Sequence, residues 1–137
     1  MATAPPITVS RLDLARLERL LEDPALAALP GASALEHELE RAEVVEPDGM
    51  PADVVTMNSR VRCVDELGGE IHHLTLVYPR DADVDQHKVS VFAPVGAALL
   101  GLSVGQSIDW DAPGGRPLRL RVTGIDYQPE AAGDLGR

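Results

Sequence analysis

Apolar residues recur at helical spacing near the start of the chain. Leu14, Leu17 and Leu21 lie three or four residues apart, which places them on one face of a helix. Ser10, followed three residues later by Asp13, is typical of a helix N-cap, and Asp13 then belongs to the polar face of that helix. Pro24 interrupts the pattern, so the predicted helix ends before it.

A second helical pattern begins near Ser33. In it, Leu35, Leu39 and Ala42 face inward and a series of glutamates faces mostly outward. Each predicted helix has about 12 residues and is about 18 Å long. Two such helices joined by a short loop over residues 24–31 form an antiparallel hairpin. We therefore expect a short helical hairpin, or coiled coil, as an N-terminal unit over residues 1–49.

The pattern changes at the proline- and glycine-rich turn over residues 47–51, which we take as a domain boundary. After it, apolar and polar residues alternate as in strands; Arg60 and Arg62, for example, alternate with apolar residues and are expected on one solvated face. The predicted strands are residues 59–64, 71–78, 88–92, 107–111 and 116–128. Residues 50–137 are therefore expected to form an α+β domain of mainly antiparallel strands around one helix.

That one helix is predicted between the third and fourth of these strands. Pro94 suits the first turn of a helix because its missing N–H would be unpaired there in any case. Gly101 follows the apolar stretch at a place where a helix can end in the left-handed conformation.

Composition narrows the function classes. The chain has 137 residues, a net charge of -10 and only 3% aromatic residues, so its core must be aliphatic. Negative charge opposes nucleic-acid binding, which depends on Lys and Arg. It favours a basic protein partner, although solubility alone explains it equally well. The single cysteine, Cys63, excludes an internal disulfide and a multi-cysteine zinc site, and we expect it to be buried on a strand.

Other sequence signals are absent. The first residues do not resemble a signal peptide, and the longest apolar stretch is too short to span a membrane, so we expect a cytoplasmic protein. No nucleotide-binding motif is present. His72 and His73 are adjacent on a strand and point to opposite faces, so they cannot easily share a metal ion. We expect no metal and no cofactor.

Several motifs carry a family resemblance. SVFAPVGAALLGL over residues 90–102, the following V-G-x-S segment and the A-P-G-G turn over residues 112–115 together resemble the C-terminal domain of the Gre transcript-cleavage factors. VTMNSRV over residues 55–61, LVYP over 76–79 and YQPEAAGD over 127–134 extend the resemblance to Gre-like regulators over nearly the whole chain. The resemblance implies an FKBP-like fold for the C-terminal domain and bacterial RNA polymerase as the partner.

The resemblance also implies where the polymerase docks. In Gre factors, the matching strand-to-helix junction docks at the rim of the polymerase secondary channel. The residues implied here are Ser90, Phe92, Pro94, Val95 and Gly96. Phe92 replaces a polar residue of the Gre factors, and two interpretations stay open for it: an exposed interface hot spot or a core residue.

The tip of the hairpin is a second candidate site. In Gre factors, acidic residues at the tip of a long coiled coil help to hold a catalytic Mg²⁺, and Glu22 and Asp23 lie nearest the tip here. The predicted helices are much shorter than in Gre factors and the tip is apolar and flanked by proline, so we do not expect transcript cleavage. The alternative for Glu22 and Asp23 is a solvated helix end.

Two functions from different classes follow. One is a non-enzymatic, monomeric regulator of transcription that binds RNA polymerase near the secondary channel and competes with Gre-type factors. The other is a peptidyl-prolyl isomerase, suggested by the FKBP-like fold alone. Isomerase pockets of this fold are rich in aromatic side chains, and the few aromatic residues of this chain favour the first function. We expect Trp110, Tyr78 and Tyr127 to be core or edge residues rather than a ligand site.

Overall fold

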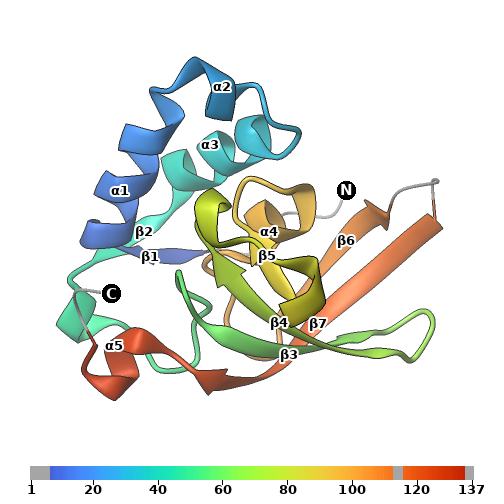
Figure 1. The fold of residues 1–137 in the computed structure, drawn as a ribbon. Coiled ribbons are helices and arrows are strands. Elements are labelled where there is room, and N and C mark those ends of the chain that lie inside the picture. The colour runs from blue at the N-terminus through green and yellow to red at the C-terminus, as the bar shows by residue number, and fades with distance from the viewer. Residues whose placement is uncertain (1–6, 113–115, 135–137) are drawn as a thin grey trace.

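The computed structural model describes residues 7–112 and 116–134 (Figure 1). The N-terminal part holds three helices, α1 (Arg11–Leu21), α2 (Pro24–Ala27) and α3 (Ala32–Arg41). The predicted cap is confirmed, since the backbone N–H of Asp13 donates to Ser10 Oγ at 3.0 Å. The predicted plain loop over residues 24–31 is wrong in part, because it contains α2. Asp23 Oδ1 accepts a hydrogen bond from the Ala25 N–H at 2.9 Å and caps this short helix.

Two three-residue strands bracket the helices and were not predicted. β1 (Thr8–Ser10) and β2 (Glu43–Val45) pair in parallel. Strands of this length show too little alternation to be recognised in a sequence. Their pairing holds the two ends of the helical hairpin together.

A five-stranded sheet with the order β5-β4-β3-β7-β6 forms the rest of the fold. Its strands are β3 (Arg60–Asp65), β4 (Ile71–Val77), β5 (Lys88–Ser90), β6 (Ser107–Ala112) and β7 (Arg116–Tyr127). All pairs are antiparallel except β4–β5, which is parallel. The predicted α+β class and each predicted strand are confirmed, and the A-P-G-G turn extends beyond the described residues.

Short helices connect and end these strands. The 3-10 turns η1 (Pro47–Gly49), η2 (Pro79–Asp81) and η3 (Val84–Gln86) lie in the loops. The predicted helix is α4 (Pro94–Leu99), and Gly101 follows it with φ of 83°, as expected for a left-handed residue. A further short helix, α5 (Pro129–Ala132), follows β7 and was not predicted.

One hydrophobic core joins the hairpin to the sheet. α4 lies between α3 and the strands in Figure 1. The core contains Leu17, Leu35 and Leu39 from the hairpin together with Phe92 and Leu99 from the C-terminal part. Cys63 on β3 is also fully buried, as predicted.

Backbone hydrogen bonds cross between the same two parts. The Thr8 N–H donates to the Gly101 carbonyl at 3.2 Å, and the Gly31 N–H donates to the Phe92 carbonyl at 2.9 Å. The hairpin is therefore packed and hydrogen-bonded to the C-terminal part. The predicted domain boundary between residues 1–49 and 50–137 stays a prediction.

Candidate functional site

The strand-to-helix junction between β5 and α4 is a tight turn built around Ser90. The Phe92 N–H donates to Ser90 Oγ at 3.0 Å, and the Ala93 N–H donates to the Ser90 carbonyl at 3.0 Å. A serine hydroxyl that accepts from the backbone two residues ahead stabilises such a turn. The Ser90 side chain therefore shapes the junction.

Phe92 belongs to the core. Its side chain is only 1% exposed and is among the largest fully buried side chains of the described residues. The interpretation of Phe92 as an exposed interface residue is therefore wrong, and the core interpretation holds. Sequence left both open because an aromatic residue just before a helix can face either side.

Two close backbone approaches fix the junction from within. A Cβ atom at Gly96 would collide with the Ser90 carbonyl oxygen. A Cβ atom at Gly31, at the start of α3, would collide with the Phe92 carbonyl oxygen. Of the five implied docking residues, Ser90 shapes the turn, Phe92 and Gly96 are buried, Pro94 is exposed and Val95 is half-buried. The accessible part of the junction is exposed Pro94 together with the half-buried Ser90, Ala93 and Val95.

The hairpin tip holds its two acidic residues in solvent. Glu22 and Asp23 are both exposed. Glu22 is the C-cap of α1 and Asp23 is the N-cap of α2, so Asp23 has a structural role at this point. Among the described residues, no group of three or more His, Cys, Asp or Glu side chains is placed to hold a metal ion.

A buried carboxylate links α1 to the sheet, and sequence reasoning placed it wrongly. Asp13 is 3% exposed, although its position was assigned to the polar face of the helix. Its Oδ2 accepts a hydrogen bond from the Met57 N–H at 3.3 Å, and the Tyr78 hydroxyl lies 3.5 Å from Oδ1. Burial, with a smaller contribution from the negative charge of Glu130, raises the pKa of Asp13 from 3.8 to about 6.

Segments that carry the family resemblance meet around Asp13. Met57 belongs to VTMNSRV, Tyr78 to LVYP and Glu130 to YQPEAAGD. Thr56 Oγ1 donates to Glu130 Oε1 at 2.7 Å and also lies 2.8 Å from the hydroxyl of Ser59. Burial and the negative charge of Asp13 raise the pKa of Tyr78 to about 12. These motif residues therefore form a polar cluster that sets the position of α1 on the sheet.

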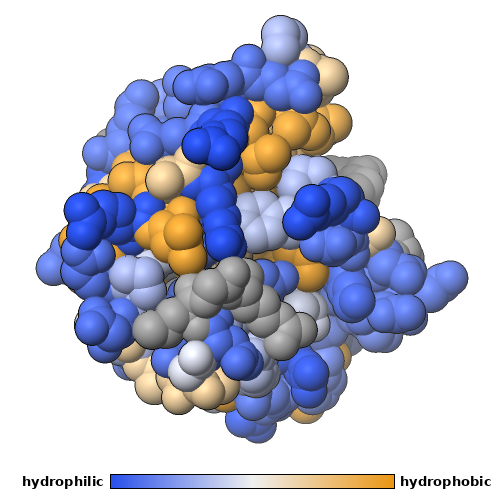
Figure 2. Space-filling model, turned by 60° about the vertical axis from the view of Figure 1, so that its left-hand side comes forward, coloured by the Kyte–Doolittle hydropathy of each residue, from blue (hydrophilic) through white to orange (hydrophobic). Residues whose placement is uncertain are grey.

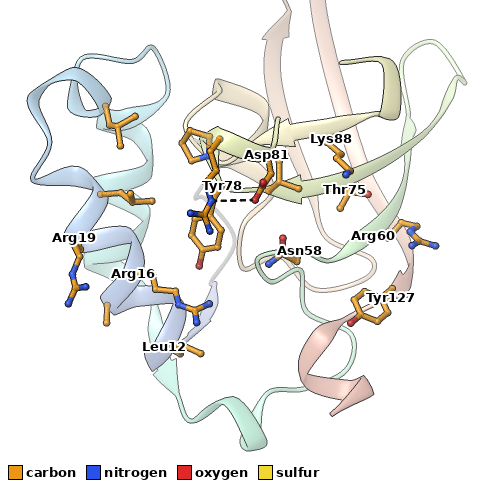
Figure 3. A pocket seen from close by; sticks show the side chains of 16 residues that line it. Leu12, Arg16, Arg19, Asn58, Arg60, Thr75, Tyr78, Asp81, Lys88 and Tyr127 are labelled. Carbon is orange, nitrogen blue, oxygen red and sulfur yellow. Dashed lines mark ion pairs between the residues drawn. The ribbon is translucent and has the colours of Figure 1, made fainter. Parts of the chain in front are cut away.

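A cleft of about 1160 Å³ opens between α1 and the sheet. Figure 3 shows Arg16 and Arg19 of α1 on one side and Asn58, Arg60 and Lys88 on the other. Sequence reasoning missed this cleft because its walls come from separate segments: residues 12–26, 58–60, 75–88 and residue 127. Sequence placed Arg60 on an exposed strand face, which is confirmed, but could not show that the face borders a cleft.

The remaining candidates add little. His72 is half-buried and His73 is exposed, as expected for neighbours on one strand. Tyr127 is half-buried and lines the cleft. The side chain of Trp110 is not among those that the structure describes. No helix among the described residues is long and apolar enough to cross a membrane.

Comparison with known proteins assigns the two parts separately. The family described as "Rnk N-terminus" matches residues 5–45. The family described as "Transcription elongation factor, GreA/GreB, C-term" matches residues 50–127. The "Regulator of nucleoside diphosphate kinase" of Escherichia coli K12 is 53% identical over 130 residues, covering 95% of this chain and 96% of the relative. This chain belongs to the Rnk family, the regulators of nucleoside diphosphate kinase.

Relatives of the Rnk family extend to Gre-type proteins. The "Transcription elongation factor GreA" of Sinorhizobium medicae is 39% identical over 83 residues, covering 61% of this chain and 52% of that protein. Among solved structures, a "Prokaryotic transcription elongation factor GreA/GreB from Nitrosomonas europaea" is 51% identical with a TM-score of 0.75. It covers 90% of this chain and 99% of its own. The resemblance drawn from the motifs is therefore confirmed, and the C-terminal part has the Gre-type fold.

Proposed function

We propose that this Rnk-family protein is a non-enzymatic, monomeric, cytoplasmic regulator that binds bacterial RNA polymerase at the rim of its secondary channel and competes there with Gre-type factors. The observation that carries the proposal is the exposed Pro94 at the junction between β5 and α4. This junction lies within residues 50–127, which match the GreA/GreB C-terminal family. Relatives named as transcription elongation factors support this kind of partner. The effect on nucleoside diphosphate kinase that names the family then acts through transcription.

The docking surface consists of the accessible part of the junction. Pro94 occupies the first position of α4 and Val95 follows it, while the turn beneath them is fixed by Ser90 and by the close approach of Gly96. A rigid, partly apolar surface of this kind loses little conformational entropy when a partner binds.

A charge placed at Pro94 tests this surface. Pro94→Glu keeps a residue that the first turn of a helix accepts well, so α4 should still form. Leu67→Glu is the matched control, because Leu67 is 60% exposed in the turn between β3 and β4. The measurement is displacement of labelled GreA from purified core RNA polymerase.

We expect the unmodified protein and Leu67→Glu to displace GreA equally, and Pro94→Glu to require at least about tenfold more protein, equivalent to about 1.4 kcal/mol. If the unmodified protein leaves GreA bound, the proposal is wrong. Equal displacement by Pro94→Glu would move the docking surface away from the junction.

The short hairpin favours competition without transcript cleavage. α1 has 11 residues and α3 has 10, which corresponds to about 16 Å of helix. We expect no shortening of RNA in stalled elongation complexes when this protein is added. Efficient cleavage that is lost in the double variant Glu22→Gln, Asp23→Asn would show that the tip does reach the active site.

The isomerase alternative has a direct test. The only phenylalanine of the chain is in the core, so it cannot contribute to an aromatic cradle for a proline ring. We expect no acceleration of prolyl isomerisation in a coupled peptide assay. Catalysis well above the uncatalysed rate would favour the isomerase instead.

A further inference from the structure

The cleft between α1 and the sheet concentrates positive charge in an acidic protein. The chain has 12 Lys and Arg residues and 22 Asp and Glu residues. Among the residues that the structure describes, five basic residues line the cleft, whereas one acidic residue, Asp81, does so. The basic lining residues are Arg16, Arg19, Arg60, Arg80 and Lys88. The cleft therefore has the opposite charge balance to the rest of the chain.

Ion pairs outside the cleft strengthen the contrast in charge between the cleft and the rest of the chain. Four arginines outside the cleft form ion pairs: Arg11 with Glu46, Arg41 with Glu38, Arg62 with Asp126 and Arg119 with Asp109. Inside the cleft, Arg80 lies 3.9 Å from Asp81. Arg19, Arg60 and Lys88 form no ion pair with any described residue. Figure 3 shows Arg19 and Arg60 at opposite borders of the cleft, with their side chains pointing away from each other. Unpaired like charges along the borders of a cleft attract an anionic partner.

The helical wall of the cleft is aliphatic. Leu12, Ala15, Leu20 and Leu26 line it beside the arginines of α1. Figure 2 shows strongly hydrophilic side chains on both sides of a hollow, with hydrophobic side chains at its upper end. A partner that fills the cleft must therefore offer both negative charge and apolar side chains.

These properties favour an acidic protein segment over nucleic acid. Single-stranded nucleic acids bind through stacking on aromatic side chains and through many phosphate contacts. The wall on α1 offers leucines instead, and a net charge of -10 repels a long polyanion more strongly than a short acidic peptide. A segment with glutamates on one face and leucines on the other matches both walls.

We propose that the cleft between α1 and the sheet binds an acidic amphipathic segment of a partner protein, with Arg19, Arg60 and Lys88 contacting its carboxylates and the leucines of α1 and α2 contacting its apolar face. This inference is independent of the junction at Pro94, so the two proposals can fail separately.

A labelled peptide tests the proposal with the full-length protein. The probe has about 18 residues, or about 27 Å as a helix, with Glu and Leu at amphipathic spacing. A Lys/Leu peptide of the same pattern and a labelled oligo-dT of similar length complete the set. Fluorescence anisotropy is measured at about 0.05 M salt, where surface charges are weakly screened, and again at about 0.3 M.

We expect the Glu/Leu peptide to bind and the Lys/Leu peptide and oligo-dT not to bind in the same concentration range. Arg19→Glu and Arg60→Glu should each weaken binding by about fivefold, since each reversal replaces an attraction of an exposed pair with a repulsion. Arg121→Glu is the matched control, because Arg121 is exposed on β7 and does not line the cleft. It should bind the peptide like the unmodified protein.

Three results would overturn the proposal. One is no preference for the Glu/Leu peptide over the Lys/Leu peptide at low salt. A second is an equal loss of binding in Arg121→Glu and Arg60→Glu. The third is tighter binding of oligo-dT than of the Glu/Leu peptide, which would make the cleft a nucleic-acid site. Equal melting temperatures for the four proteins ensure that binding and not folding is compared.

Discussion

Replacing Asp13 by asparagine should make the protein more stable at neutral pH. The carboxylate is 3% exposed, and asparagine has the same shape and keeps an oxygen that can accept from the Met57 N–H. The variant removes a buried negative charge that also faces the negative charge of Glu130. The substitution therefore removes an electrostatic cost while leaving the packing unchanged.

The size of the effect follows from the pKa of Asp13. Because the pKa rises from 3.8 to about 6 on folding, the folded protein holds this proton more tightly than the unfolded chain does. Stability from this group is complete below pH 3.8 and falls as the pH rises to about 6. Above pH 7 the free energy of unfolding is lower by about 3 kcal/mol because of this group. About 2 kcal/mol of this decrease occurs between pH 4.5 and 7.5. Asp13 lies near the start of α1, where negative charge is favourable by up to about 1 kcal/mol, so the net gain is smaller.

Urea unfolding at several pH values measures this directly. The quantity of interest is the free energy of unfolding of Asp13→Asn minus that of the unmodified protein, since the titration of groups that do not interact with Asp13 cancels in the difference. It should grow by about 2 kcal/mol between pH 4.5 and 7.5. Asp48→Asn, at an exposed position in η1, is the control for the same substitution outside the buried cluster. A difference for Asp13→Asn that does not change with pH would refute the reasoning.

Other substitutions test the junction and its support. Phe92→Ala should destabilise the protein by about 3–5 kcal/mol, because it leaves a cavity in the core; an unchanged melting temperature would contradict its burial. Gly31→Ala should cost about 1–3 kcal/mol, since its Cβ would collide with the Phe92 carbonyl. Gly49→Ala, which meets nothing within 4 Å, should be neutral or slightly stabilising in the same melting assay. Ser90→Ala should lose about 1 kcal/mol in urea unfolding, because the Phe92 N–H loses its partner.

Much of the fold was predictable because the relevant signals are local. The cap at Ser10, the start of α4 at Pro94 and the left-handed Gly101 depend on residues within one helical turn. Alternation along β3 fixed its buried and exposed faces for the same reason. The motifs over residues 90–102 then indicated the Gre-type domain, which the comparisons confirmed.

The sites were less predictable because they depend on contacts between distant segments. Asp13 looks like a surface residue of an amphipathic helix, and only the approach of Met57 and Tyr78 makes it a buried one. Phe92 could not be assigned to the core until α3 was placed beside the junction. The cleft exists only between elements, and no single stretch of sequence contains enough of its lining to reveal it.

The place of β7 in the sheet has a consequence for how the protein folds during synthesis. β7 is made after the other four strands of the described sheet, yet it lies between β3 and β6 in the sheet order. Until residues 116–127 have left the ribosome, β3 has an unpaired edge and β6 has no neighbour. Helices as short as α1 and α3 are not stable alone. Because the hairpin packs on the same core as the sheet, it also cannot fold stably before β7 has been made. A nascent chain that stalls before β7 therefore exposes strand edges that are open to aggregation, and stable folding of the sheet requires β7.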